Sequence, residues 1–321
     1  MLDQALELTV IGSFTRVGYA LRRHLWGWES PPPDALEGRT VLVTGPTSGL
    51  GRAATDELAA LGARIILVGR SGERLAAVRD SLASRRGIDR FPIVVADMGS
   101  LRSVEAAVAR ILDTEPGLDV VVDNAGTIFP ERTTGPDGIE ATLATLVVGP
   151  FALISGLLPL LRRTGAARVV AVTSGGMYTQ RLDLDDLQSG AGPFSGPRVY
   201  ARAKRAQVAL IREWARRLRA SGVTFNAMHP GWADTPGLAQ QLPGFHRLMG
   251  PILRTPAEGV DTLVWLASAP GADTLSGGLF LDRRRRPFDR VPATRLSAGD
   301  RRRLWNAVVK LSGMPDPAPE G

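Results

Sequence analysis

A glycine-rich turn between an apolar run and a helical stretch constrains the fold of this chain more than any other feature. The run Val41–Thr44 leads into Thr44-Gly45-Pro46-Thr47-Ser48-Gly49-Leu50-Gly51, and helical periodicity follows over Gly51–Leu61. Glycine permits a tight turn and close backbone approach, and the start of the helix presents free N–H groups and a positive dipole end. The unit predicts a phosphate-binding turn. A glycine turn without a ligand is the alternative.

The rest of the chain repeats the alternation of apolar runs and helical stretches. Further buried strands are predicted at Arg64–Val68, Ile93–Ala96, Val120–Val122, Val169–Thr173, Val223–Met228 and Leu279–Leu281. Helices are predicted between them at Gly72–Arg85, Leu101–Leu112, Ile139–Arg163, Val199–Ala220 and Pro256–Ala267. This alternation predicts an α/β fold, a single doubly wound Rossmann-type domain over residues 39–285 with a parallel sheet of about seven strands.

Two segments flank the predicted domain. In residues 1–38, apolar side chains recur at helical spacing before a Pro-rich linker, at Leu6, Val10, Phe14, Val17, Leu21 and Leu25. This amphipathic helix either packs against the domain or a second subunit, or lies on a membrane surface with its arginines toward lipid phosphates. The uncharged stretch Leu8–Thr15 is too short to span a bilayer, and no signal-peptide pattern follows, so we expect a cytoplasmic protein with peripheral membrane contact at most. Residues 286–321 form a C-terminal extension with a helical stretch near Asp300–Leu311.

Composition narrows the chemistry. The chain has no cysteine, and its three histidines, His24, His229 and His246, lack metal-ligand spacing, so we expect no metal. The formal net charge of +7 suits either anionic partners or a solvated basic surface. The run Arg283–Arg286 has no interleaved aromatic residues, which argues against a nucleic-acid partner.

The end of the second predicted strand indicates which dinucleotide the turn would hold. An acidic residue there hydrogen-bonds the adenosine ribose of NAD, whereas an arginine accommodates the 2′-phosphate of NADP. The sequence is Val68-Gly69-Arg70-Ser71, without an acid, and Arg52 in the first helix adds positive charge. We therefore expect NADP(H) in preference to NAD(H). A surface arginine without a ligand is the alternative for Arg70.

Two further strand ends fit a bound dinucleotide. Asp97 ends the third strand in Ala96-Asp97-Met98, where its carboxylate would meet the adenine amine, cap the helix Leu101–Leu112, or do both. Asp123-Asn124-Ala125-Gly126 ends the fourth strand with small residues that suit a backbone passing close to the cofactor. An ordinary Asn-type turn is the alternative for this second site.

Tyr200 and Lys204 form the candidate acid/base pair. They stand at positions i and i+4, on one face of a predicted helix. A nearby ammonium favours the phenolate, so we expect Lys204 to lower the pKa of Tyr200 and make it a usable general acid/base. Ser174 follows the fifth strand, and strand carboxyl ends line the ligand crevice of a parallel sheet. A turn or cap serine is the alternative for Ser174.

These motifs, in this order over Gly38–Asp282, resemble the short-chain dehydrogenase/reductase family, and most of all its retinol-dehydrogenase-like branch; the last of them is His229-Pro230-Gly231. The resemblance implies that Tyr200 protonates the substrate oxygen, Lys204 tunes Tyr200 and holds the nicotinamide ribose, and Ser174 binds the carbonyl oxygen. The residues that it places at the cofactor are Thr44, Gly45, Thr47, Ser48, Gly49, Leu50, Gly51, Arg70, Asp97, Met98, Asn124, Ala125, Gly126, Tyr200, Lys204, Pro230, Gly231 and Thr235.

One position departs from the family pattern. Aligned on Gly149, the place of the family's usual active-site asparagine holds Leu146, which cannot bind the water that links the lysine to solvent. We therefore expect an NADP(H)-dependent oxidoreductase that interconverts a carbonyl and an alcohol, and keep a non-catalytic cofactor-binding scaffold or redox sensor as the alternative. The apolar segment Trp232–Leu253 predicts a lid for an apolar small molecule, or else a satellite core or the contact of a homodimer.

Overall fold

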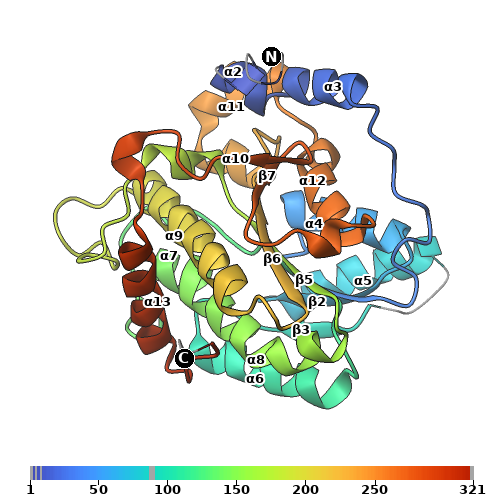
Figure 1. The fold of residues 1–321 in the computed structure, drawn as a ribbon, viewed down its shortest axis with the longest axis horizontal. Coiled ribbons are helices and arrows are strands. Elements are labelled where there is room, and N and C mark those ends of the chain that lie inside the picture. Colours follow the sequence, from blue (N-terminus) through green and yellow to red (C-terminus); the bar gives the residue numbers. More distant parts are fainter. Residues whose placement is uncertain (1–2, 4–5, 8, 87–90, 319–321) are drawn as a thin grey trace.

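One sheet of eight strands runs through the part of the chain that the computed structural model describes, residues 3, 6–7, 9–86 and 91–318 (Figure 1). The strand order is β3-β2-β1-β4-β5-β6-β7-β8, parallel except for β8. The strands are β1 (Thr40–Thr44), β2 (Arg64–Gly69), β3 (Ile93–Val95), β4 (Val120–Asp123), β5 (Ala167–Val172), β6 (Val223–Met228), β7 (Leu279–Leu281) and β8 (Arg284–Arg286). The predicted Rossmann-type α/β fold is confirmed. The antiparallel strand β8 was missed because its three arginines carry no apolar signal.

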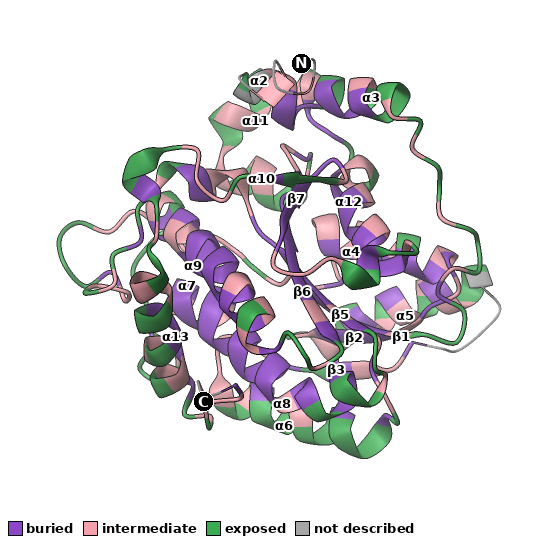
Figure 2. Ribbon diagram, in the orientation of Figure 1, coloured by how far each residue is buried: buried purple, intermediate pink, exposed green. Residues whose placement is uncertain are grey.

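Helices cover both faces of the sheet, which explains why the strands read as continuous apolar runs. On one face α4 (Gly49–Ala60), α5 (Gly72–Arg86) and α12 (Pro256–Ser268) share a core with Val41 and Val43. On the other, α6 (Leu101–Thr114), α8 (Gly149–Arg163) and α9 (Gly196–Arg217) share a core with Leu42. Figure 2 shows the buried strands and inner helix faces in purple between these two layers.

The long helix predicted at Ile139–Arg163 is broken into three parts. A short turn, α7 (Ala141–Leu143), leads into a π-helical segment, η1 (Ala144–Val148), and then into α8. Alone among the described residues, Ala141–Arg163 is a helix long and apolar enough to cross a bilayer, but 83% of its most apolar window is buried inside the protein. It is therefore a core helix. A π-helical segment inside a helix often marks a functional position, and here it contains Leu146.

Over the described residues 10–25, the predicted N-terminal helix is divided in two. The two parts are α2 (Val10–Phe14) and α3 (Arg16–Leu25), separated at Thr15, whose backbone is extended. The expectation of one continuous apolar face is wrong because the break turns Phe14 into the protein and leaves Val17 and Leu25 largely exposed. In Figure 1 both helices lie along the upper edge of the molecule, with α11 (Pro243–Met249) next to α2. The N-terminal segment therefore packs on the domain, which is one of the interpretations that the sequence offered. Its contact with a membrane and its contact with a second subunit stay predictions.

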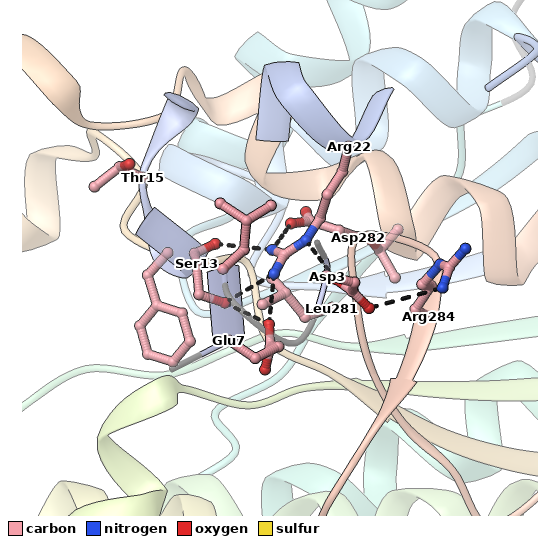
Figure 3. Close-up of polar contacts among 12 residues, drawn as sticks. Asp3, Glu7, Ser13, Thr15, Arg22, Leu281, Asp282 and Arg284 are labelled. Carbon is pink, nitrogen blue, oxygen red and sulfur yellow. Dashed lines mark hydrogen bonds and ion pairs between the residues drawn. The ribbon is translucent and has the colours of Figure 1, made fainter. Parts of the chain in front are cut away.

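A buried ionic cluster fixes this N-terminal segment to the sheet (Figure 3). The guanidinium of Arg22 is fully buried and donates to Asp282 (2.6 Å), to Glu7 (2.6 Å) and to Asp3 (3.0 Å). Arg254, also buried, donates to both carboxylate oxygens of Asp282 at 2.6 and 2.9 Å. We call Arg22, Arg254 and Asp282, with Asp3 and Glu7, the N-terminal cluster.

The arginine run Arg283–Arg286 also joins the N-terminal segment to the sheet. Arg283 pairs with Asp261, Arg284 stacks on Trp26, and Arg286 pairs with Asp3. Asp282 and Arg283 both have positive φ, at 55° and 53°, and form the two-residue turn between β7 and β8. These side chains therefore hold the N-terminal segment and the β7–β8 hairpin together.

The C-terminal extension packs on the domain. Its helix α13 (Ala298–Ser312) begins with a capping box of Ser297 and Asp300. Trp305 is fully buried, 4.7 Å from the ring of Trp214 and 5.1 Å from that of Phe151. Residues 319–321 of the extension lie outside the described residues, and the proposed boundaries at 38 and 285 stay predictions.

Candidate active site

The glycine-rich turn joins β1 to α4 as the sequence predicts. Gly45 and Gly49 have φ of +70° and +53°, values that favour glycine. Ser48 is the N-cap of α4, yet its side chain accepts no hydrogen bond from the first turn, and that turn holds no acidic residue. The uncapped N–H groups and the positive dipole end of α4 fit a pyrophosphate.

Thr44 and Asn124 hold the turn against the end of β4. The Thr44 hydroxyl accepts hydrogen bonds from the backbone N–H groups of Asn124 and Ala125, both at 2.9 Å. The Asn124 amide donates to the carbonyl oxygens of Thr44 (2.9 Å) and Gly45 (3.3 Å). A Cβ on Gly45 would lie 3.1 Å from Cα of Ala125. The two predicted motifs are thus one unit, and these two side chains position its backbone.

Arg70 is exposed just after the end of β2, and within the described part of the chain no carboxylate forms an ion pair with it. Arg52, by contrast, is paired with Asp56 at 3.0 Å and donates to Ser81. Arg70 therefore has its guanidinium free to meet a phosphate, while Arg52 has partners already. The geometry fits a dinucleotide with a 2′-phosphate at this strand end.

Asp97 does not cap α6. The N-cap is Ser100, whose hydroxyl accepts from the N–H of Ser103, while one Asp97 oxygen accepts from the N–H of Gly99 at 2.9 Å. The cap role considered for Asp97 is therefore wrong, because the helix begins four residues later, at Leu101. Met98 is buried, and its carbonyl oxygen lies so close to Gly149 that a Cβ there would overlap it.

The segment after β6 returns to the glycine-rich turn. A Cβ on Gly49 would meet the Thr235 side chain at 3.4 Å, and Thr235 caps α10 (Pro236–Gln241) by accepting from Leu238. A Cβ on Gly259 would lie 2.9 Å from Leu50 and 3.6 Å from Pro230. The structure therefore brings these predicted cofactor residues to the same edge of the sheet as the turn.

Ser174 and Lys204 lie where β5 ends against α9, and Tyr200 stands one turn before Lys204 on that helix. Lys204 donates from Nζ to the carbonyl oxygen of Val172 at 2.7 Å, and Thr173 donates to the carbonyl oxygen of Lys204 at 3.0 Å. The Ser174 hydroxyl accepts from the N–H of Gly176, and a Cβ on Gly176 would touch both Ser174 and Ala201, the neighbour of Tyr200. Ser174 is thus a cap, and its hydroxyl proton is still available for donation.

The electrostatics differ from the expectation that Lys204 lowers the pKa of Tyr200. Burial raises the pKa of Tyr200 to about 12, and Nζ of Lys204 lies 5.8 Å from the centre of its ring. Burial lowers the pKa of Lys204 to about 8, against which the charge of Asp123 acts. The expectation is wrong for this state of the protein because loss of water around the phenol outweighs the lysine charge.

Three residues around Lys204 and Ser174 were not singled out as site residues from the sequence. Asp123 is buried, with one carboxylate oxygen bonded to Gln207, and Gln207 also contacts Nζ of Lys204. Phe14 lies against Gly175, next to Ser174, with its ring 4.6 Å from that of the buried His229. The position of Gln207, three residues after Lys204 on one helix, is a signal that could have found it; Phe14 gives no comparable signal.

Leu146 is fully buried in the π-helical segment beside this site. A Cβ on Gly126 would lie 2.6 Å from a methyl of Leu146 and 3.9 Å from Nζ of Lys204. An apolar side chain therefore stands next to the buried ammonium, where the resemblance led us to expect an amide.

Comparison with known proteins agrees with this arrangement. Residues 39–243 match the family profile described as short chain dehydrogenase. The chain is 38% identical to dehydrogenase/reductase SDR family member 12 of Bos taurus, over 83% of this chain and 84% of the relative. It is 39% identical to DnrU of Streptomyces sp. (strain C5), a protein named for daunorubicin C-13 ketoreduction, over 88% and 95% of the two chains. It is 35% identical to retinol dehydrogenase 14 of Mus musculus, over 78% and 79%.

Solved structures show the same fold. A short chain dehydrogenase from Escherichia coli CFT073 complexed with NADPH is 26% identical, with a TM-score of 0.65 over 79% of this chain and 100% of that one. A short chain dehydrogenase from Salmonella enterica serovar Typhi is 26% identical, with a TM-score of 0.67 over 80% and 100%. The chain therefore belongs to the short-chain dehydrogenase/reductase family and is an oxidoreductase.

Proposed function

We propose that this protein uses NADP(H) to interconvert a carbonyl and an alcohol on an apolar small molecule, with Tyr200 as the general acid/base. The observation that carries the cofactor preference is Arg70, exposed at the end of β2 without an acidic partner in the described residues. A planar guanidinium there pairs with a 2′-phosphate, which NAD lacks. The relative complexed with NADPH supports the same assignment.

The phenol of Tyr200 is suited to donate a proton. With its pKa raised to about 12, it is protonated at neutral pH, which is the state that carbonyl reduction requires. Ser174 would donate its hydroxyl proton to the same carbonyl oxygen and stabilise the charge that develops there. Lys204 would hold the ribose and stabilise the phenolate left after proton transfer. NADPH, when bound, supplies the hydride.

An apolar substrate is supported by the segment beyond β6. Trp232 and Phe245 pack edge to face at 5.0 Å, and Trp232 also meets Phe14 at 5.9 Å, so aromatic rings stand near Ser174 from two elements. Leu248 on α11 is 79% exposed, which suits a lid that contacts an apolar ligand. The names of two relatives refer to daunorubicin C-13 ketoreduction and to retinol dehydrogenation.

A cofactor-binding scaffold or redox sensor is the second candidate. The observation that favours it is Leu146, an apolar side chain next to the ammonium of Lys204. In that case NADPH binds with the same contacts, but proton transfer through Tyr200 is too slow for turnover.

Fluorescence titration with NADPH and NADH, followed by absorbance at the reduced-nicotinamide band with apolar aldehydes and ketones, tests the proposal. We expect tighter binding of NADPH and turnover that falls by about 10²- to 10⁴-fold in Tyr200→Phe, the usual contribution of a general acid. NADPH affinity is the control for folding of that variant. Tight binding without turnover on an all-trans-retinal and daunorubicin panel would favour the scaffold, and failure to bind either nucleotide would contradict both candidates.

A further inference from the structure

Lys204 is a buried cation to which the described part of the chain offers no direct anionic partner. It is 2% exposed, and its Nζ donates to the carbonyl oxygen of Val172 at 2.7 Å and to Oε1 of Gln207 at 3.3 Å. Within the described residues no carboxylate oxygen lies within ion-pair distance of it. A lone buried charge is costly, so a compensating group is expected close by.

Asp123 is the matching buried anion. It is 3% exposed at the end of β4, and its Oδ2 accepts a 2.6 Å hydrogen bond from the Gln207 amide nitrogen. Its Oδ1 is buried and has no hydrogen-bond partner in the described residues. Asp123 is therefore held at one oxygen only, which is an expensive arrangement for a carboxylate whose sole function is structural.

Gln207 connects the two charges through a single amide. Its carbonyl end accepts from Lys204 and its amino end donates to Asp123, and reversing the amide would break both contacts. Gln207 is itself 5% exposed on α9, one turn after Lys204. The chain Lys204–Gln207–Asp123 is therefore a directional, buried polar connection across α9 and β4.

Among the residues that the structure describes, Asp123 is the charged group that acts on Lys204. On α9 the titratable neighbour of Lys204 is Tyr200, and at the end of β5 the Lys204 ammonium donates to the backbone carbonyl of Val172. On the side of Gly126, the π-helical segment contributes Leu146, which is apolar. Asp123 is the one charge that raises the pKa of Lys204 against the effect of burial, and burial in turn raises the pKa of Asp123.

We propose that Asp123, aligned by Gln207, is the counterion that keeps Lys204 protonated, and that both are positioning residues for the acid/base site. The assignment of Lys204 to that site rests on the proposed function; the charge coupling itself does not. In this chain the acid and the amide perform, from β4 and α9, the polar support for the lysine that Leu146 cannot give.

The lysine content of the chain makes a direct test possible. Of its 39 basic residues only Lys204 and Lys310 are lysines, so a protein labelled with [ε-¹³C]lysine gives two NMR signals. Lys310→Arg assigns them, and Lys310, exposed at the end of α13, is the internal control. Titration of the ¹³Cε shift then reports the pKa of Lys204 without cofactor or substrate.

In Asp123→Asn we expect the pKa of Lys204 to fall by about one unit or more, the effect of losing an opposite charge a few ångströms away. In Asp123→Asn/Gln207→Glu, which moves the carboxylate into direct contact with Nζ, the pKa should return to the wild-type value or exceed it. Lys310 should titrate identically in all variants.

An unchanged Lys204 pKa in folded Asp123→Asn would overturn the proposal, as would failure of the double variant to restore it. If Asp123→Asn does not fold, the same titration on Gln207→Leu decides: a lowered pKa supports the coupling and an unchanged one overturns it. Since the readout needs no turnover, a protein that binds no nucleotide would contradict the proposed function and leave this result standing.

Discussion

Arg22 and Lys204 are both cations that the fold removes from water, yet their surroundings shift their pKa values in opposite directions. Around Arg22, burial lowers the pKa, but Asp282, Glu7 and Asp3 together outweigh it and the net pKa is raised. Around Lys204, burial dominates and the pKa falls to about 8. The first cation touches three carboxylates, while the second is separated from its acid by an amide.

The difference distinguishes a cation that stabilises the fold from a cation that can take part in proton transfer. A guanidinium stays charged in proteins and forms several directional bonds, so it suits a permanent junction between distant segments. An ammonium with a reduced pKa can change its charge near neutral pH, which a proton-transfer site can use. Three variants test whether this division is correct.

The largest expected effect is on stability, in the N-terminal cluster. Asp282→Asn keeps a side chain that tolerates positive φ but leaves the buried guanidinium groups of Arg22 and Arg254 without their shared carboxylate. Removing one partner of a buried ion pair costs about 3–5 kcal/mol in the free energy of unfolding. Chemical denaturation measures it. The comparison variant is Asp123→Asn, for which we expect a smaller loss of about 1–2 kcal/mol, because Asp123 acts on Lys204 through Gln207 and not by direct contact with a cation. Equal losses in both variants would show that the two acids do not differ in this way.

The second effect is on the pH dependence of stability. The pKa of Lys204 is about 8 in the folded protein and near 10.5 in the unfolded chain. Between these two pH values the unfolded chain binds more protons, so the free energy of unfolding rises with pH in that window. Lys204→Met should therefore be the more stable protein at pH 7, by on the order of 3 kcal/mol, with the gap closing toward pH 10.5. Denaturant titrations of both proteins at several pH values measure it. A gap that is constant with pH would show that Lys204 is not destabilised by burial.

The smallest effect concerns Arg70, an exposed cation that has no ion-pair partner among the described residues. Arg70→Glu should weaken NADPH binding by about 10- to 100-fold, the range expected for loss of a charge-assisted contact. NADH affinity should change little, and Arg74→Glu on the adjacent helix is the control for a general charge effect. Equal losses for both nucleotides would argue that Arg70 does not contact the 2′-phosphate.

The local pattern of the sequence was enough to predict the strands of the sheet from β1 to β7 and the main motifs. Parallel strands are buried on both faces, so their apolar runs stand out, and strands β6 and β7 begin and end where predicted, at Val223–Met228 and Leu279–Leu281. The glycine-rich turn, the strand ends and the Tyr200/Lys204 pair likewise depend on residues near one another in the chain. Strand β8 was missed because it consists of three arginines, which carry no apolar signal, and because its pairing with β7 depends on a two-residue turn at Asp282 and Arg283.

Only the tertiary structure decided what the charged residues do. The sequence could not pair Arg22 with Asp282, 260 positions away, nor place Asp123 next to Lys204 through Gln207. It predicted one N-terminal helix, and the break at Thr15 that turns Phe14 toward Gly175 appears only in the folded chain. The physical reason is that propensity and periodicity are local, whereas burial, hydrogen-bond partners and pKa depend on which segments the sheet brings together.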